Sequence, residues 1–235
     1  MIEYKARASS AGVLLTNPRT KKAQEAGELS KTAQTLVQDW YKAQIYGRDK
    51  DIYSRYLDKG VAVERKSLVW MADKLDLGMV LKANQESFED EFFSGTPDLI
   101  LPDEVIDIKN SWSSDTFPLF ADEITNNLYR TQLQVYMHLT KKPKARLVYV
   151  LSNTPNYLVV EDIKWRTLDL RKNGNTLDDE ELAELAQETM AKHNYDNIET
   201  KYRIKTFCLD YDPLAIEELQ SRVEGAREYL KTIII

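Results

Sequence analysis

Two carboxylates and one amine fall within a short stretch of the chain. Asp98 begins the first of two short apolar runs, Asp107 and Lys109 lie on the second, and a Pro-Asp pair separates the runs. This pattern predicts a β-hairpin. Because side chains alternate along a strand, Asp107 and Lys109 share one face, and Asp98 can join them from the neighbouring strand. Such a group suits a divalent metal ion and an activated water molecule.

The same spacing has a plainer interpretation, because an Asp and a Lys two residues apart on a strand usually form a solvated face. The apolar neighbours weaken it. Val105, Ile106 and Ile108 place hydrophobic side chains on both faces of the strand, which indicates burial. Charged groups inside such a strand are costly unless they are paired or bound to a metal. We therefore expect the cluster to have a function.

Apolar periodicity predicts the elements that position this cluster. We expect a short helix in residues 1–18, helices at about 20–47, 51–76 (with Gly60 as a break or a close approach), 121–140, 177–193 and 212–231, and strands within about 79–93, 146–151 and 203–209. The residues from 152 to about 172 are ambiguous, and no assignment is made there. The alternation predicts an α/β fold with a mixed central sheet flanked by helices.

The whole chain is expected to form a single domain, 1–235. It contains no internal repeat, low-complexity tract or linker. Within it we expect a core at about 51–151, an N-terminal helical segment at 1–50, and a C-terminal strand and helices at 176–235.

Composition excludes several kinds of site. The single cysteine, Cys208, rules out an internal disulfide and an iron–sulfur cluster held by four cysteines, and two histidines leave little room for a zinc site. The net charge of −6 does not by itself indicate nucleic-acid binding, although basic residues gather at 19–22 and 141–146. No apolar run is long enough to span a membrane and no apolar signal core begins the chain, so we expect a cytoplasmic protein.

Four features occur in an order that resembles a known superfamily. Glu64 lies on a predicted helix, Asp98 follows a proline, Asp107 and Lys109 form an Asp-X-Lys motif, and a later helix carries the Gln-X-X-X-Tyr motif of residues 132–136. This order resembles the PD-(D/E)XK nucleases, particularly the branch of phage lambda exonuclease and the YqaJ-type viral recombinases. The resemblance covers about residues 7–150. It implies the αβββαβ core of restriction endonucleases.

The resemblance implies a metal site position by position. Asp98 corresponds to the carboxylate that bridges the metal ions, and Asp107 to a second ligand that is Glu in many relatives. The Ile108 carbonyl would be a further ligand, Glu64 would complete a second metal position, and Lys109 corresponds to the catalytic lysine. The implied ion is Mg²⁺, for which Mn²⁺ can substitute. Whether the lysine orients the water, deprotonates it or offsets negative charge is left open.

The resemblance also implies a set of residues that contact DNA or its 5′-phosphate: Arg7, Ser10, Thr96, Gln132, Gln134 and Tyr136. Three of these residues have structural alternatives, since Ser10 could cap a helix and the pair Gln132 and Tyr136 could form a polar stripe at a helix–sheet boundary. Trp112 follows the Asp-X-Lys strand and could stack on a base or cover the core.

The implied function is a metal-dependent deoxyribonuclease, in particular a 5′→3′ double-strand exonuclease of phage-type recombination. The implied partners are double-stranded DNA ends, a single-strand annealing protein, and further copies of the chain in a ring. Two alternatives remain open. A structure-selective or restriction-type endonuclease on the same fold would cut closed circular DNA. A catalytically silent DNA-binding module is expected to have lost part of the motif, but Asp98, Asp107 and Lys109 are all present.

Overall fold

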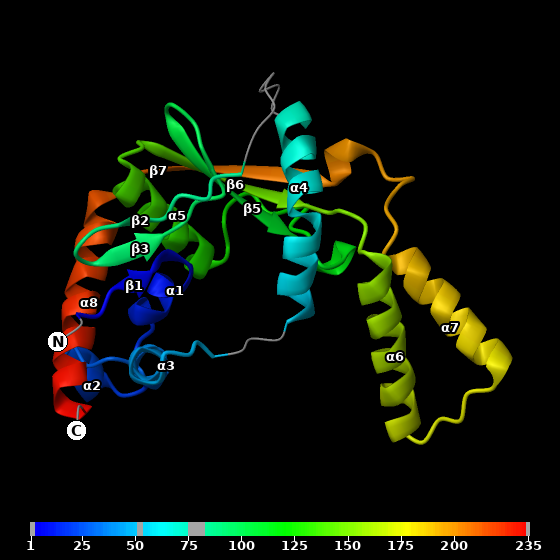
Figure 1. Cartoon of the computed structure of the whole chain (residues 1–235), viewed down its shortest axis with the longest axis horizontal. Coiled ribbons are helices and arrows are strands. Elements are labelled where there is room, and N and C mark those ends of the chain that lie inside the picture. Colours follow the sequence, from blue (N-terminus) through cyan, green and yellow to red (C-terminus); the bar gives the residue numbers. More distant parts are fainter. Residues whose placement is uncertain (1–2, 51–53, 75–82, 234–235) are drawn as a thin grey trace.

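A computed structural model describes residues 3–50, 54–74 and 83–233, in which helices flank two small mixed sheets (Figure 1). The predicted mixed α/β fold class is confirmed. The strands divide into a three-stranded and a four-stranded sheet. Within the described ranges, no helix has both the length and the apolar character needed to cross a membrane.

Helices and strands alternate along most of the chain. The helices are α1 (Ala8–Ala11), α2 (Lys21–Glu25), α3 (Lys31–Tyr46), α4 (Arg55–Lys74), α5 (Asn127–Thr140), α6 (Asn156–Lys172), α7 (Asp179–Lys192) and α8 (Pro213–Ile233), with 3-10 turns η1 (Gly12–Leu15), η2 (Ser114–Thr116) and η3 (Thr200–Tyr202). The strands are β1 (Ala6–Arg7), β2 (Phe88–Glu89), β3 (Phe93–Gly95), β4 (Leu99–Ile100), β5 (Glu104–Asn110), β6 (Lys144–Val150) and β7 (Ile204–Asp210).

The larger sheet has the order β4-β5-β6-β7 and carries the Asp-X-Lys motif on β5. The central β5–β6 pair is parallel and is connected through α5, whereas both outer pairs are antiparallel. The predicted hairpin is confirmed as β4–β5, with Leu99 opposite Ile106 and Ile100 opposite Val105. The pairing with β4 stops at Ile106, so in the described structure the end of β5 extends past its neighbour.

The two faces of this sheet are covered by different helices, α4 and α5. Ile106 belongs to a buried cluster with Leu68 and Met71 of α4, whereas Val105 belongs to the main core with Leu133 of α5. Each buried aliphatic side chain contributes roughly 1.5–3 kcal/mol. Alternation along β5 therefore directs Asp107 towards α5, while α4 covers the opposite face.

Several predicted helix boundaries are wrong. The helix expected at about 20–47 is interrupted between α2 and α3, where Gly27 has a φ of +68° and Ser30 caps α3 by accepting the Ala33 N–H at 3.0 Å. α5 begins later than predicted, after the cap residue Asn126. Gly60 lies within α4 without breaking it. Residues 79–82 of the predicted strand region lie outside the described residues, and β2 and β3 follow later.

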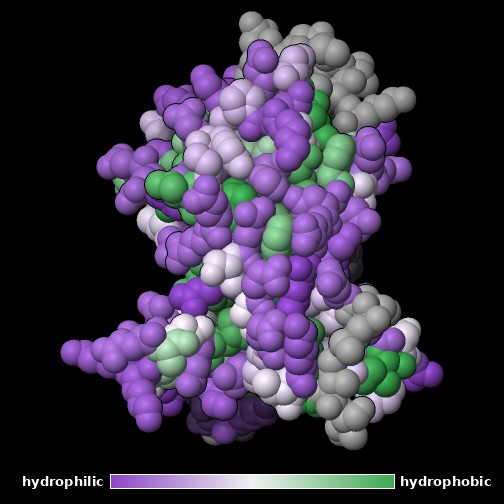
Figure 2. All heavy atoms as spheres, turned by 90° about the vertical axis from the view of Figure 1, so that its left-hand side faces the viewer, coloured by the Kyte–Doolittle hydropathy of each residue, from purple (hydrophilic) through white to green (hydrophobic). Residues whose placement is uncertain are grey.

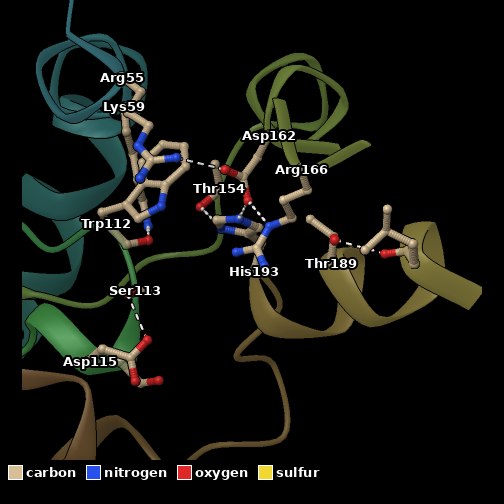
Figure 3. A network of polar contacts seen from close by, with 12 residues as sticks. Arg55, Lys59, Trp112, Ser113, Asp115, Thr154, Asp162, Arg166, Thr189 and His193 are labelled. Carbon is tan, nitrogen blue, oxygen red and sulfur yellow. Dashed lines mark hydrogen bonds and ion pairs between the residues drawn. The ribbon is translucent and has the colours of Figure 1, made fainter. Parts of the chain in front are cut away.

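The unassigned region contains α6, which forms a hairpin with α7 that projects away from the sheets (Figure 1). The base of this hairpin is held by the buried carboxylate of Asp162. It accepts from Arg55 Nη1 at 2.7 Å and from Arg166 Nε at 2.7 Å, and lies 3.3 Å from His193 Nε2 (Figure 3). Arg55 belongs to α4, so this carboxylate joins the hairpin to the helix that carries Glu64.

The face of the molecule on the α8 side is largely hydrophilic, and apolar side chains occur there in small separate groups (Figure 2). Beneath it, Ile216, Leu219 and Val223 of α8 join the main core. α8 begins at Pro213, as predicted, and Asp212 accepts the N–H groups of the first turn.

Candidate active site

Asp107 and Lys109 lie side by side at the end of β5. Asp107 is only 1% exposed, and its Oδ2 lies 2.7 Å from Lys109 Nζ. Lys109 is the ion-pair partner of this buried oxygen among the described residues. A buried carboxylate is costly unless it is paired, and this ammonium offsets part of that cost. The Oδ1 atom accepts from Gln132 Nε2 at 3.3 Å.

Asp98 joins this pair from the start of β4. Its Oδ2 accepts the backbone N–H of Ile108 at 2.6 Å, which fixes the carboxylate against the edge of β5. In a strand, the N–H and C=O of one residue point to the same edge. The Ile108 carbonyl is therefore directed towards the side where Asp98 lies and where β4 has ended.

Glu64 approaches from α4 across a cavity of about 460 Å³. Glu64, Asp98, Ile108 and Lys109 all line this cavity, together with the aromatic residues Tyr56, Trp112, Tyr129 and Tyr149. Its volume lies within the range of small-molecule sites, about 300–1,000 Å³. The cavity thus brings the acid of α4 to the strand residues of the predicted motif.

Burial and crowding of carboxylates disturb the acid–base properties of the cluster. Burial, together with the negative charges of Asp107 and Glu64, raises the pKa of Asp98 to about 7. Burial lowers the pKa of Lys109, but Asp107 and Asp98 have the greater combined effect, so the pKa of Lys109 is raised. The cluster therefore favours a proton on Asp98 or a nearby cation.

The oxygen donors of this cluster fit a hard divalent cation. Asp98, Asp107 and the Ile108 carbonyl provide oxygen ligands, and the raised pKa of Asp98 indicates crowded negative charge that a cation would relieve. As the side chains are placed, no three His, Cys, Asp or Glu residues of the described structure converge into a ready-made metal site. Glu64 lies on the other wall of the cavity, and small side-chain movements would be needed to complete such a site.

Gln132 and Tyr136 of α5 face the cluster together. Besides its contact with Asp107, Gln132 Nε2 donates to the Tyr136 hydroxyl at 2.8 Å. Burial and then the charge of Asp107 raise the pKa of Tyr136. These two buried side chains therefore lie beneath the carboxylate of Asp107.

Arg7 approaches the same region from the N-terminal segment. β1 runs parallel to β3 with Arg7 opposite Ser94, two residues before Thr96. The charge of Arg7 is close enough to Tyr136 to favour its ionised form. The structure thus brings Arg7 and the exposed Thr96 to the Tyr136 side of the cluster.

Gly95 permits this close approach. A Cβ at Gly95 would lie 2.8 Å from Tyr136 Cε1 and 2.9 Å from Ala8 Cβ. Ser10 lies within α1, and its hydroxyl donates to the Arg7 carbonyl at 3.2 Å. The helix-cap alternative for Ser10 is wrong, because Arg7 occupies the cap position and makes no side-chain cap bond.

Gln134 is not brought to the cluster. Its Nε2 donates to the Asp210 carbonyl, and its Oε1 accepts the Asp212 N–H, both at 2.9 Å. Two residues along a helix correspond to a turn of about 200°, so Gln132 and Gln134 point in opposite directions. The placement of Gln134 gives no support to the implied contact with the 5′-phosphate.

Two aromatic residues lie near the cluster. Tyr129, which is not among the residues predicted from the sequence, has its ring centre 5.0 Å from Lys109 Nζ. Its spacing of three from Gln132 on one helix was an available signal. Trp112 is buried and packs edge-on against Tyr56 and His193, so of its two interpretations the covering of the core agrees with the structure.

Comparison with solved structures shows which known proteins share this fold. A phage-related exonuclease from Haemophilus somnus 129PT superposes with a TM-score of 0.78 and 26% identity, covering 99% of this chain and 96% of the other. The chain has the fold of phage-type exonucleases. An alkaline exonuclease from Laribacter hongkongensis gives a TM-score of 0.63 at 12% identity over 97% of this chain and 88% of its own, and its complex with dAMP gives the same TM-score at 13% identity.

These neighbours confirm the predicted resemblance to the lambda exonuclease branch. No family model and no curated protein matches the sequence. The relationship therefore rests on the arrangement of the elements and on the order of the motif residues along them.

Proposed function

We propose that this protein is a metal-dependent deoxyribonuclease that removes nucleotides in the 5′→3′ direction from the ends of double-stranded DNA. The observation that carries the proposal is the cluster of Asp98, Asp107 and Lys109 at the end of β5, which borders a cavity shared with Glu64. The fold shared with the phage-related exonuclease supports hydrolysis from DNA ends.

Each residue of the cluster has a chemical task in this proposal. Asp98, Asp107 and the Ile108 carbonyl would hold one Mg²⁺ ion, and Glu64 would contribute to a second. When bound, such ions supply a water of lowered pKa and neutralise charge on the phosphate. Lys109 is an N–H donor beside Asp107, suited to orienting the attacking water or a phosphate oxygen. Gln132 holds Asp107 in place from below.

The proposed polarity rests on the groups around Arg7. Arg7 and Thr96 lie on the Tyr136 side of the cluster, and a guanidinium is suited to holding a terminal phosphate in a fixed position. An enzyme that holds the terminal 5′-phosphate beside its carboxylates would cut the phosphodiester bond that follows the first nucleotide. Repeated cuts of this kind would remove nucleotides in the 5′→3′ direction. We include Ser10 in this pocket only through its neighbour Arg7.

The biological setting is part of the same proposal. An enzyme of this kind would leave single strands for an annealing protein during phage-type recombination, in the cytoplasm of a bacterial host. Several copies of the chain would assemble around the duplex, which would favour processive digestion. The phage-related neighbour supports the phage origin in this setting.

The first experiment is digestion of linear duplex DNA that carries either a 5′-phosphate or a 5′-hydroxyl, with closed circular DNA as the control, in Mg²⁺, in Mn²⁺ and in EDTA. We expect metal-dependent loss of linear DNA alone, faster from 5′-phosphorylated ends. Cutting of the circle would favour the endonuclease alternative. Failure to cut any substrate would favour a DNA-binding module.

The Arg7→Ala variant tests the phosphate pocket separately. It should lose the preference for 5′-phosphorylated ends while retaining metal binding, because Arg7 belongs to the N-terminal segment rather than to the carboxylate cluster. Unchanged preference in this variant would show that the 5′-phosphate is held elsewhere.

A further inference from the structure

Lys59 is a buried basic residue that has no role in the proposed hydrolysis. Its side chain is 0% exposed, and its Nζ donates to the backbone carbonyl of Trp112 at 2.9 Å (Figure 3). The Nζ also lies 6.0 Å from the ring centres of Trp112 and Tyr195. No carboxylate of the described structure lies within ion-pairing distance of it. An unpaired buried lysine is costly, which indicates a specific role.

The contact of Lys59 joins two walls of the candidate active site. Lys59 lies on α4, five residues before Glu64, and Trp112 lies three residues after Lys109. The hydrogen bond therefore holds the helix of the acidic residue against the segment that leaves the catalytic strand.

A second contact, made by a buried serine on the other side of Glu64, joins α4 to the end of β5. The Ser67 hydroxyl donates to Asn110 Oδ1 at 2.5 Å, and Ser67 is fully buried. Asn110 is the last residue of β5 and directly follows Lys109. Glu64 is thus bracketed along α4 by two residues that hold the continuation of the catalytic strand.

This bracket matters because Glu64 and the strand carboxylates come from opposite walls of the cavity. As described above, they do not converge into a ready-made metal site. Their separation depends on how α4 lies against the end of β5. Supporting residues that orient metal ligands commonly change metal affinity when they are replaced.

We propose that Lys59 and Ser67 are positioning residues for the metal site: their hydrogen bonds to Trp112 and Asn110 fix the distance between Glu64 and the strand carboxylates Asp98 and Asp107. This inference rests on the proposed function, because it assumes that these carboxylates bind metal ions together. Neither Lys59 nor Ser67 touches substrate in this account, and both act through the placement of α4.

The test measures Mn²⁺ binding to the full chain by isothermal titration calorimetry, without DNA, in Lys59→Met and Ser67→Ala variants. Each variant should bind Mn²⁺ about 10-fold more weakly, the effect typical of supporting residues. Lys59→Gln keeps an N–H donor that is about one bond shorter, so its affinity should lie between those of Lys59→Met and the unmodified protein. The Ser30→Ala variant removes the buried side-chain cap of α3 and is the control, with unchanged Mn²⁺ affinity.

A double-mutant cycle tests whether the effect passes through Glu64. On a Glu64→Ala background, Lys59→Met should cause little further loss of Mn²⁺ affinity, because the ligand that it positions is absent. Nuclease assays should show a higher Mn²⁺ requirement with an unchanged KM for DNA. A full additional loss on the Glu64→Ala background would overturn the inference, as would unchanged Mn²⁺ affinity in both Lys59→Met and Ser67→Ala.

Mn²⁺ binding and DNA cutting by the unmodified protein test the proposed function separately from the positioning inference. If it neither binds Mn²⁺ nor cuts DNA, the proposed function fails, and the positioning inference fails with it. If it does both while Lys59→Met and Ser67→Ala behave like it, the inference alone fails.

Discussion

Replacing Lys59 with methionine should make the protein more stable at neutral pH. Burial, and then the positive charge of Arg203, lower the pKa of Lys59 from 10.5 to about 7. Other groups facing it, His193 at the C-terminal cap of α7 and Tyr195, offer no negative charge at neutral pH. Methionine has a similar length and no charge, so it removes the cost of burying an ammonium group.

The size of the effect follows from the shift. A fall in pKa from 10.5 to about 7 costs about 4 kcal/mol at pH 7, at 1.36 kcal/mol per pKa unit. The variant also loses the hydrogen bond to the Trp112 carbonyl, which is worth about 1 kcal/mol and leaves a buried acceptor unsatisfied. We expect a net gain of about 2–3 kcal/mol, or roughly 5–10 °C in Tm for a chain of this size.

The pH dependence provides the sharper measurement. Between pH 7 and pH 9 the unfolded chain keeps the Lys59 proton and the folded protein releases it, so this residue makes the free energy of unfolding rise with pH. The advantage of Lys59→Met should therefore shrink by about 2 kcal/mol over this range. Below pH 7 both states of the unmodified protein approach full protonation, and the advantage should level off.

Urea denaturation in metal-free buffer at pH 7, 8 and 9 measures these differences. The exposed Lys66 on the same helix gives a matched control, and Lys66→Met should change the free energy of unfolding by less than about 0.5 kcal/mol. A Lys59→Met advantage that does not vary with pH would show that Lys59 is charged in the folded protein throughout this range. Lower stability of the variant at pH 7 would refute the argument from burial.

Three further substitutions have definite expected outcomes. Asp98→Asn should reduce DNA hydrolysis by about 10³-fold or more while retaining stability at pH 8, because it removes a crowded buried charge; retained hydrolysis would contradict the metal site. Gly95→Ala should lower the free energy of unfolding by about 1–3 kcal/mol, because its methyl group would meet the Tyr136 ring. Urea denaturation at neutral pH measures this change, and an unchanged free energy of unfolding would contradict the argument from the close contact. Asp162→Asn should lower it by roughly 3 kcal/mol and make the α6–α7 hairpin the first site of limited proteolysis; cleavage elsewhere first would argue against its anchoring role.

The local part of the candidate site could be predicted from the sequence. Alternation along a strand requires Asp107 and Lys109 to share a face, and the structure places their charged atoms 2.7 Å apart. The helical spacing of Gln132 and Tyr136 likewise predicts a shared face, and their side chains are hydrogen-bonded.

The secondary structure was predicted wrongly or not at all where local sequence signals were weak or overlooked. The break between α2 and α3 had a signal, because Gly27 and Ser30 suit a helix end and a helix start. α6 had no clear apolar period, since Tyr157, Trp165 and Leu168 are exposed while Asp162 is buried. β1 is two residues long, and its partner β3 lies far along the chain, so no local sequence signal predicts this strand.

The sequence by itself determined the Asp-X-Lys strand, its hairpin with Asp98, and the pairing of residues on α5, because these depend on side-chain periods within one element. Only the tertiary structure decided that Gln132 rather than Gln134 faces Asp107, since that choice depends on which side of α5 packs against the sheet. It also decided that Lys59 is buried against Trp112. Packing between distant segments sets these contacts, and no local period encodes it.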